Sequence, residues 1–394
     1  KRLGFEEAMN EVMKGNEDNP LSQLIAVMLG IVFATTQKDT NLVYCTLPAG
    51  LTTLEWYAFS GCVSLTGVSV PASLSSISLS AFSNTTSLEK FIIPYSCVSL
   101  GSNVFENSGV QYIKMNKKLQ SIGAAAFKSS GLKEFKVQSS ITSMGKVDTI
   151  GGSTTEEYQD TVFHDCASLE KLDFSEQSSF LGQTFQNCTA LKEVILPQPL
   201  TTIPDNQFRN CQSLSYVSYK NGDTLVNKFP STLKKIGAYA FYSCSFTDLL
   251  LDDCTKVLIG DHAFVSNAFE TLNVQNGKIS EVGAYAFSSC SNLKTVNWEI
   301  EYNVPEYCFA YSSNLQAFKT TSIKDGIMGY AFVDCLKLDS VDIKNNGAEF
   351  IISAGAFKNC VIADMVFPEG ITTIGSQAFY GNLFKEIVFP STLL

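Results

Sequence analysis

The chain has 394 residues, a net charge of −10 and a charged fraction of 17%. This length ordinarily indicates two or three domains. Only two of the 28 basic residues are arginine (Arg2 and Arg209), whereas a nucleic-acid-binding protein needs a basic face with arginine forks. The composition therefore argues against a nucleic-acid partner.

The first 41 residues lie outside the pattern that organises the rest of the chain. Residues 5–14 predict a short amphipathic helix, and Asn19-Pro20 is typical of the start of a second helix over residues 21–37, which is apolar on nearly all sides. Three interpretations of this segment stay open: a helical cap over the domain that follows, the core of a signal peptide, or a membrane span. Acidic residues upstream argue against the signal peptide, and a span needs about 20 residues. We expect a cap over residues 1–41.

From residue 42 to residue 394 one motif recurs, as in Leu54-Glu-Trp-Tyr-Ala-Phe59-Ser-Gly-Cys62. Eleven of the thirteen gaps between successive copies of its phenylalanine are 22 to 25 residues, and self-similarity at this period indicates a solenoid. The fourteen copies are Phe59, Phe82, Phe105, Phe127, Phe163, Phe185, Phe208, Phe241, Phe264, Phe287, Phe309, Phe332, Phe357 and Phe379.

The copies share further positions once they are aligned on this phenylalanine. An apolar or aromatic residue stands five residues before it, and a small polar residue or cysteine stands three residues after it. Apolar residues then alternate with others, as in Phe91 and Ile93, which predicts a strand. The position after the phenylalanine holds Cys62, Thr85, Ser108, Ser130, Cys166, Cys188, Cys211, Cys244, Asn267, Cys290, Ser312, Cys335, Cys360 and Asn382.

This pattern predicts a parallel coil in which each repeat supplies one short strand and an irregular return. Neither part can bury its apolar side chains alone, but stacked neighbours form one continuous core. We expect the phenylalanines to stack as an internal column, each contributing about 1.5–3 kcal/mol of burial. We expect the residues three positions later to form a second column, whose thiols, hydroxyls and amides bond backbone groups in a buried turn.

Two long insertions interrupt the repeats, and both follow a predicted strand. The first lies between Val137 and Tyr158 and is acidic, and the second lies between Tyr219 and Ile236 and is basic. Insertions confined to one part of a repeat project from one edge of a solenoid, where they often contribute to binding. The chain stops at Leu394 within a repeat and without a polar cap, so we expect that the natural protein continues or that this end docks on a partner.

The grammar of these repeats resembles that of the BspA-like, or Treponema-type, leucine-rich repeats. The copies Ile236-Gly237-Ala-Tyr-Ala240-Phe241-Tyr-Ser-Cys244 and Ile374-Gly375-Ser-Gln-Ala378-Phe379 match the pattern of that family well, and the resemblance covers residues 42–394. It implies a right-handed leucine-rich-repeat solenoid with a parallel β-sheet, about fourteen repeats and a surface or secreted location. Members are associated with adhesion to host matrix proteins and to other cells, and the family has no catalytic motif.

The twelve cysteines and two histidines do not predict a catalytic or metal site. Eight cysteines occupy one repeat position that Ser, Thr or Asn can also fill, which a disulfide would not tolerate, so we expect buried free thiols. His164 and His262 each lie beside the phenylalanine column, and we expect His164 to cap a turn. No CxxC or HExxH motif is present. We expect no enzyme activity and no cofactor.

The residues that point outward from the predicted strands are the candidate binding residues. Neighbouring strands would place them in two rows, which contain Lys90, Tyr112, Glu134, Lys171, Glu193, Tyr216 and Asp248 in the first and Ile92, Lys114, Lys136, Asp173, Ile195, Ser218 and Leu250 in the second. One interpretation is a solvated face held by opposite charges on adjacent strands. The other is a partner surface, because several of these side chains are apolar. The candidate protein-binding residues are Tyr112, Lys114, Glu134, Lys136, Lys171, Asp173, Tyr216 and Leu250.

We therefore expect a non-enzymatic protein-binding or adhesion module, extracellular or at a cell surface, whose partner is a protein such as a host or matrix protein. A membrane would be reached only through an anchor outside this chain. The alternative is a scaffold, secreted or cytoplasmic, that assembles with copies of itself or with other filament components. The full-length gene would separate these hypotheses, because a signal peptide or anchor favours adhesion.

Overall fold

The structure is a computed structural model that describes residues 40–146, 162–182 and 184–390. In these ranges the regular elements are all strands. The chain divides into two compact units between Cys166 and Ala167, and each unit is described by itself below. The two helices expected before residue 41, and with them the proposed cap, lie outside the described residues.

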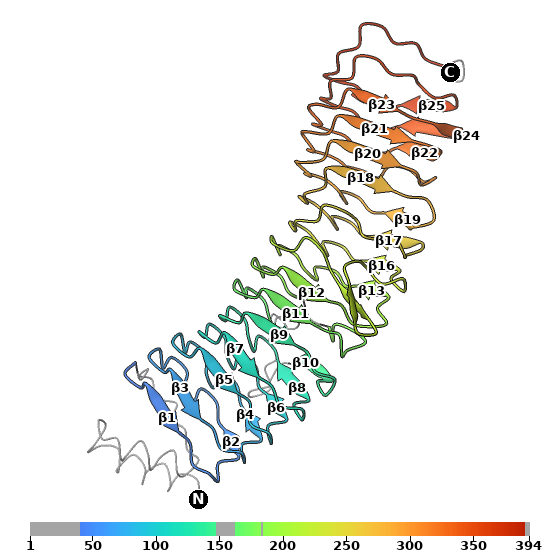
Figure 1. Ribbon diagram of the computed structural model, residues 1–394. Coiled ribbons are helices and arrows are strands. Elements are labelled where there is room, and N and C mark those ends of the chain that lie inside the picture. The colour runs from blue at the N-terminus through green and yellow to red at the C-terminus, as the bar shows by residue number, and fades with distance from the viewer. Residues whose placement is uncertain (1–39, 147–161, 183, 391–394) are drawn as a thin grey trace, which may run out of the picture. The chain divides into compact units, whose positions relative to one another are not determined.

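The first unit stacks its strands in two rows (Figure 1). The first row consists of β1 (Tyr44–Thr46), β3 (Gly67–Ser69), β5 (Lys90–Ile92), β7 (Tyr112–Lys114) and β9 (Glu134–Lys136). The second row is one parallel sheet in the order β10-β8-β6-β4-β2, made of β2 (Thr53–Leu54), β4 (Ser76–Ile77), β6 (Ser99–Leu100), β8 (Ser121–Gly123) and β10 (Ser143–Lys146).

The second unit repeats this arrangement. Its first row holds β11 (Lys171–Asp173), β12 (Glu193–Ile195), β18 (Thr271–Val274), β20 (Thr295–Trp298), β21 (Ala317–Thr320) and β23 (Ser340–Asp342). Its second row holds two parallel sheets, β13 (Thr202–Ile203), β16 (Lys235–Ile236), β17 (Val257–Ile259) and β19 (Ile279–Val282), then β22 (Ile323–Ile327), β24 (Asn345–Ile352) and β25 (Ile371–Ile374). Most coils thus contribute to two rows of strands.

The prediction of one strand per coil is therefore incomplete. The strands of the first row were expected from their alternating apolar residues. Apart from β10, which ends at Lys146 before the first insertion, those of the second row end at or next to the apolar residue five positions before the core phenylalanine. Several contain only two residues, such as Ser76-Ile77. A segment this short carries no alternation of its own. It is a strand because it pairs in parallel with the same segment of the coils before and after it.

The phenylalanine column is confirmed. Thirteen of the fourteen rings are buried, and Phe379 is half-buried. In the first unit the rings from Phe59 to Phe163 stack at centroid distances of 5.3 to 5.6 Å with their planes within 10°. In the second unit the rings from Phe185 to Phe379 stack at 5.1 to 6.0 Å. Aromatic side chains of the first strand row pack against the column edge-on, as Phe91 does against Phe105.

The turn that carries the core phenylalanine has an unusual backbone. In nearly every described coil the residues two before and two after the phenylalanine have a left-handed φ, as Tyr239 (φ 56°) and Ser243 (φ 52°) do around Phe241. This geometry lets three amides of one turn donate to three carbonyls of the next coil. Phe241 N–H, for example, donates to the carbonyl of Ala263 at 2.9 Å.

The coils approach each other closely at the glycine that follows the second strand. A Cβ atom added at Gly260 would lie 2.7 Å from the amide nitrogen of Ala238 on the preceding coil, closer than side-chain carbons come to backbone. The Ile-Gly step of the repeat therefore has a steric cause.

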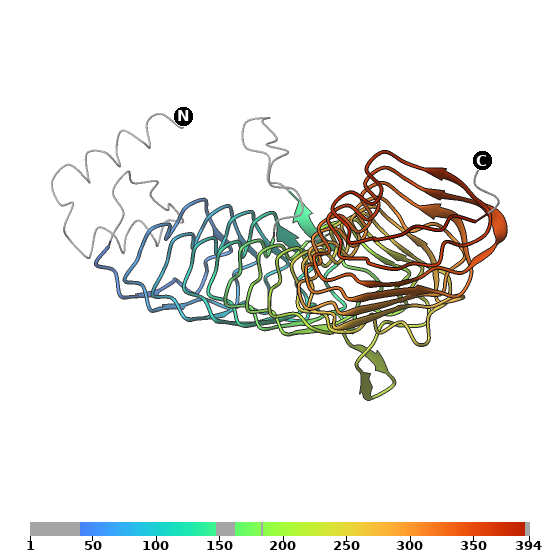
Figure 2. The same ribbon diagram turned by 90° about the horizontal axis from the view of Figure 1, so that it is seen from above.

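The second insertion folds as an antiparallel hairpin of β14 (Tyr219–Asn221) and β15 (Thr224–Val226), which projects from the coils of its unit (Figure 2). Its two-residue turn is Gly222-Asp223, and Gly222 has the positive φ of 61° that such a turn requires. Residues 147–161 of the first insertion lie outside the described residues.

Candidate functional site

The first unit presents an exposed strand face on β5, β7 and β9. Tyr112 is 42% exposed and Ile92 is 60% exposed. β5 and β7 pair in parallel with Lys90 opposite Tyr112 and Ile92 opposite Lys114, so the two exposed apolar side chains are diagonal neighbours. Lys90 and Lys133 lie 6.0 and 5.6 Å from the Tyr112 ring centroid. Glu134 and Lys136 are also exposed, and so four candidate residues point outward here as expected.

In the second unit the expected row begins as a strand face held by charge. β11 and β12 pair with Lys171 opposite Glu193, and the Lys171 Nζ lies 3.0 Å from the Glu193 Oε1. Both side chains are partly exposed, so this cross-strand pair contributes about 0.2–1 kcal/mol. Asp173 lies opposite Ile195 in the same register. Lys171 and Asp173 are half-buried. At this position the contacts agree with the interpretation of a strand face held by opposite charges on adjacent strands.

The prediction that Ile195 and Ser218 are outward surface residues is wrong. Ile195 is 4% exposed and Ser218 is fully buried. The segment that returns from the hairpin contacts this row, because the Ser218 hydroxyl lies 2.9 Å from the Asn227 Oδ1 and bonds to it. Tyr216 is half-buried. The second insertion was expected to project from the edge of the solenoid, but its return segment covers part of this strand row.

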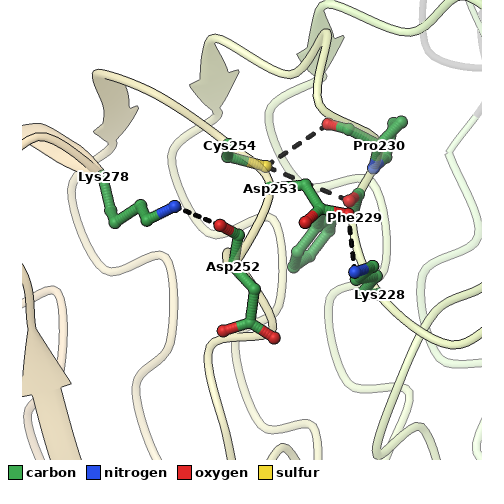
Figure 3. A network of polar contacts seen from close by, with 7 residues as sticks. All are labelled: Lys228, Phe229, Pro230, Asp252, Asp253, Cys254 and Lys278. Atoms are coloured by element: carbon green, nitrogen blue, oxygen red, sulfur yellow. Dashed lines mark hydrogen bonds and ion pairs between the residues drawn. The ribbon is translucent and has the colours of Figure 1, made fainter.

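The prediction that Leu250 points outward from a strand is also wrong. Leu250 lies in a loop, is half-buried and has a left-handed φ of 54°. The return segment of the hairpin is bonded to this loop: Phe229 N–H donates to the Leu250 carbonyl at 3.2 Å, and the Lys228 Nζ is 2.5 Å from the Asp253 Oδ2. Figure 3 shows the contact between Lys228 and Asp253 and, next to it, the Cys254 thiol, which lies 3.3 Å from the Pro230 carbonyl oxygen. These contacts bend the chain where a strand would otherwise continue the row.

A hollow of about 160 Å³ lies beside this loop. Its polar lining residues are Asp248, Asp252, Asn273, Gln275 and Lys278, and its apolar ones are Leu249, Leu251 and Ile279. Lys278 Nζ donates to the Asp252 carbonyl, so two of the lining residues are bonded to each other (Figure 3). The hollow is small and polar, so it suits one side chain of a partner better than a whole ligand.

The residues three positions after each core phenylalanine form the predicted second column, here called the polar column. Nine of their side chains are directed at the carbonyl of the core phenylalanine on the preceding coil, whereas the Thr85 hydroxyl bonds to the Phe82 carbonyl of its own coil. The donor-to-oxygen distances are 2.9 Å for Cys166, 3.1 Å for Cys211 and Cys244, 2.8 Å for Asn267, 3.5 Å for Cys290 and Ser312, 3.2 Å for Cys335 and Cys360 and 2.7 Å for Asn382. One role explains why thiols, hydroxyls and amides interchange at this position.

All twelve cysteines are free in the structure, and eleven are buried; Cys45 is half-buried. Burial raises the pKa of the Cys290 thiol to about 12 and that of Cys97 to about 11. We expect iodoacetamide to modify the native protein slowly, because the thiolate is the reacting form, and to modify it fully in denaturant. Mass spectrometry of the non-reduced, alkylated protein checks this, and linked peptides from Cys188, Cys211 or Cys244 would contradict it.

The raised thiol pKa values also predict a pH dependence. The folded protein keeps protons on these thiols that the unfolded chain releases near pH 9. The contribution of the buried thiols to the free energy of unfolding is therefore fully present below that pH and decreases above it. We expect the denaturation midpoint to fall as the pH rises from 9 toward 11.

Sequence reasoning missed one surface. On five successive coils of the second unit the residue two positions before the core phenylalanine is aromatic, and the rings of Tyr239, His262, Tyr285, Tyr307 and Tyr330 stack. Successive centroids are 4.5, 4.5, 4.5 and 5.1 Å apart. We call these five residues the aromatic ladder. The alignment on the core phenylalanine already contained this signal, but the search was for core positions.

Within the described ranges, no group of three or more His, Cys, Asp or Glu side chains is placed to hold a metal ion. No helix among the described residues is long and apolar enough to cross a membrane.

These features define a parallel β-solenoid of the leucine-rich-repeat class, with an exposed strand face and hydrogen-bonded turns. The model of the BspA-type leucine-rich repeat region matches residues 34–147, 149–229, 219–339 and 302–394. The chain therefore belongs to the BspA-type leucine-rich repeat family.

Solved structures share the fold. A leucine-rich repeat protein from Bacteroides ovatus is similar with a TM-score of 0.69 and 24% identity, over 86% of this chain and 84% of that one. A leucine-rich repeat protein from Eubacterium ventriosum is similar with a TM-score of 0.51 and 20% identity, over 89% of this chain and 91% of that one. A comparison with curated proteins finds no match.

Proposed function

We propose that this chain is a non-enzymatic, protein-binding module of a secreted or cell-surface protein, and that the strand face binds the partner. Membership of a leucine-rich-repeat family supports a role in protein interaction. The observation that carries the proposal is the exposed pair Ile92 and Tyr112 on the adjacent strands β5 and β7. Exposed apolar and aromatic side chains ringed by charge are the usual composition of a binding hot spot.

The charged candidates surround this pair in the first unit. Lys114, Glu134 and Lys136 supply both signs of charge around Tyr112, which favours orientation of a partner over strength of binding. In the second unit Lys171, Asp173 and Tyr216 are half-buried, so we propose for them a secondary role at the rim. Leu250 lies in a loop beside the polar hollow, and its proposed contribution is to that hollow rather than to a strand face.

The test is a double substitution, Ile92→Ser with Tyr112→Ser, in binding assays on immobilised matrix proteins with albumin as the blank. We expect the substitution to raise the dissociation constant about tenfold or more, because a hot-spot residue contributes about 2 kcal/mol. The fold should persist, since both side chains are exposed.

The matched control is Tyr95→Ser with Val98→Ser. These side chains are 64% and 40% exposed in the same unit but lie outside the strands. An equal loss of affinity in both double variants would mean that any exposed apolar side chain contributes to binding, and not the strand face in particular. No effect of the Ile92 and Tyr112 substitutions would place the site elsewhere. A mass that rises with concentration in light scattering would instead favour the scaffold hypothesis.

A further inference from the structure

The aromatic ladder occupies a position where aromatic residues are conformationally unfavourable. Its five residues all have left-handed backbone, with φ between 52° and 57°. Asparagine tolerates this conformation far better, and Asn103 and Asn206 fill the same position on other coils with φ of 56° and 55°. The fold therefore requires the left-handed residue, but it does not require a ring. Five consecutive rings call for a reason beyond the turn.

The ladder offers its edges to solvent and not its faces. Neighbouring planes lie within 15° of each other, so each ring covers the next. The Arg209 guanidinium lies 5.1 Å from the Tyr239 centroid at one end, and at the other end the Tyr330 ring packs on Gly355, where a Cβ would overlap it. All five residues are half-buried. A flat sugar ring needs an open aromatic face, so this surface does not suit one; a row of phenol hydroxyls and ring edges remains.

A row of carboxylates runs beside the ladder. The residue immediately before each ladder position, and before its equivalent Asn206, is acidic on alternate coils: Asp205, Asp261 and Glu306, with Ala238, Ala284 and Gly329 on the coils between. We call the three carboxylates the acidic row, and all are exposed. The coils of Asp261 and Glu306 are separated by two ring spacings of 4.5 Å each, so the chain positions that carry the acidic side chains repeat at roughly 9 Å.

The aspartates of this row are held in place. Asp205 Oδ1 accepts a hydrogen bond from the Ala238 amide at 2.9 Å, and Asp261 Oδ1 accepts one from the Ala284 amide at 2.8 Å. Each carboxylate has a second oxygen for another donor. Burial lowers the pKa of His262, so that ring is neutral near pH 7 and does not offset the row.

The spacing selects the kind of chain that fits. In a polyproline-II helix, with about three residues per turn and about 3.1 Å per residue, every third side chain lies on one side at intervals of about 9 Å. In a β-strand the side chains of one face repeat at about 6.8 Å, which does not match. Polyproline-II segments bind to aromatic surfaces in known recognition modes. We propose that the aromatic ladder and the acidic row form a docking surface for a basic polyproline-II segment of a partner protein.

The probe is a fluorescein-labelled peptide of five Lys-Pro-Pro repeats, and its counterpart has the same composition with the lysines clustered at one end. Fluorescence anisotropy with the full chain should show saturable, salt-sensitive binding of the periodic peptide and binding of the clustered peptide about fivefold or more weaker. The variant Asp261→Asn with Glu306→Gln should weaken the periodic peptide about tenfold. The substituted amide at position 261 would keep an acceptor oxygen for the Ala284 N–H, so the turn is preserved.

The ladder is tested by Tyr285→Asn with Tyr307→Asn, because asparagine fills this position elsewhere in the fold. We expect about fivefold weaker binding with an unchanged melting temperature or a small decrease. The charge-matched control is Asp339→Asn with Asp342→Asn on and beside β23, which should leave binding unchanged. Equal affinity for both peptides, unchanged affinity in the acidic-row variant, or no saturation at about 1 mM peptide would overturn the proposal. So would a ladder-dependent dimer that binds neither peptide, since it would make a second copy the occupant.

Discussion

The substitution Phe241→Ala is expected to lower the free energy of unfolding by about 3–5 kcal/mol. Its ring is fully buried and stacks between Phe208 and Phe264 at centroid distances of 5.5 and 5.3 Å. Phe229, from the hairpin return, and Phe246 also contact it, at centroid distances of 5.8 and 4.8 Å. Removing the ring leaves a void that stacked neighbours cannot fill, because each is held at the spacing of its coil.

The effect should spread along the column. Coils are stable only through their neighbours, so loss of one ring weakens the interfaces on both sides. Chemical denaturation measures the total effect, and hydrogen exchange of the Phe208 and Phe264 amides measures its reach. The control is Leu336→Ala, a large-to-small change at a side chain that is 56% exposed, and it should change stability by less than about 0.5 kcal/mol. An unchanged melting temperature in the Phe241 variant would refute the column as the main source of stability.

The repeat predicted most of what lies inside the coils. The core phenylalanine, the strand around Phe91 and the polar column follow from spacing, because each position has a similar environment from coil to coil and so takes chemically similar side chains. The prediction that small polar side chains in the turn bond the backbone holds for thiols, hydroxyls and amides alike.

The second row of strands could not be predicted in the same way. Ser76-Ile77 has one core residue and one half-buried residue, and its extended conformation comes from pairing with the coils on either side. The burial of Ile195 and Ser218 depended on where the second insertion folds. The sequence Asn221-Gly222-Asp223 in this insertion is a recognisable hairpin turn signal. It was not used for the prediction, which described the insertion only by its basic residues.

The candidate site was predicted in part. Tyr112, Lys114, Glu134 and Lys136 point outward because the alternation of their strands is regular. Leu250 was placed by counting from a core phenylalanine, but the coil after Phe241 bends where the hairpin return bonds to it. The aromatic ladder was missed because periodic aromatic residues were interpreted as core, and these five rings are stacked but not buried.

Asn267→Leu is expected to lower the free energy of unfolding by about 2–4 kcal/mol, although leucine has nearly the same shape and the site is only 3% exposed. The amide nitrogen of Asn267 donates to the Phe241 carbonyl at 2.8 Å, and its Oδ1 accepts from the Phe246 amide at 2.9 Å. Leucine would leave the Phe246 N–H buried without a partner, which costs about 1–3 kcal/mol. It would also remove one of the two hydrogen bonds to the Phe241 carbonyl, leaving the one from the Cys244 N–H.

An amide in the polar column can make a second hydrogen bond, as Asn267 and Asn382 both do. Asn267 and Asn382 each follow a coil in which the next apolar residue, Phe246 or Ile362, comes five residues after the core phenylalanine. In both cases the Oδ1 accepts the N–H of that apolar residue. Serine or cysteine at the same position has a donor for the carbonyl but cannot reach both groups.

Asn267→Ser is therefore the graded control, expected to retain the bond to the Phe241 carbonyl and to lose only the Phe246 partner. Unfolding in denaturant should rank wild type above Asn267→Ser and Asn267→Ser above Asn267→Leu. Hydrogen exchange of the Phe246 amide should accelerate in both variants, while exchange of the Phe241 amide, which bonds to Ala263, should change little in the serine variant. If the leucine variant were as stable as the wild type, the side-chain bonds of the polar column would contribute nothing to the fold, and packing of small residues alone would account for the column.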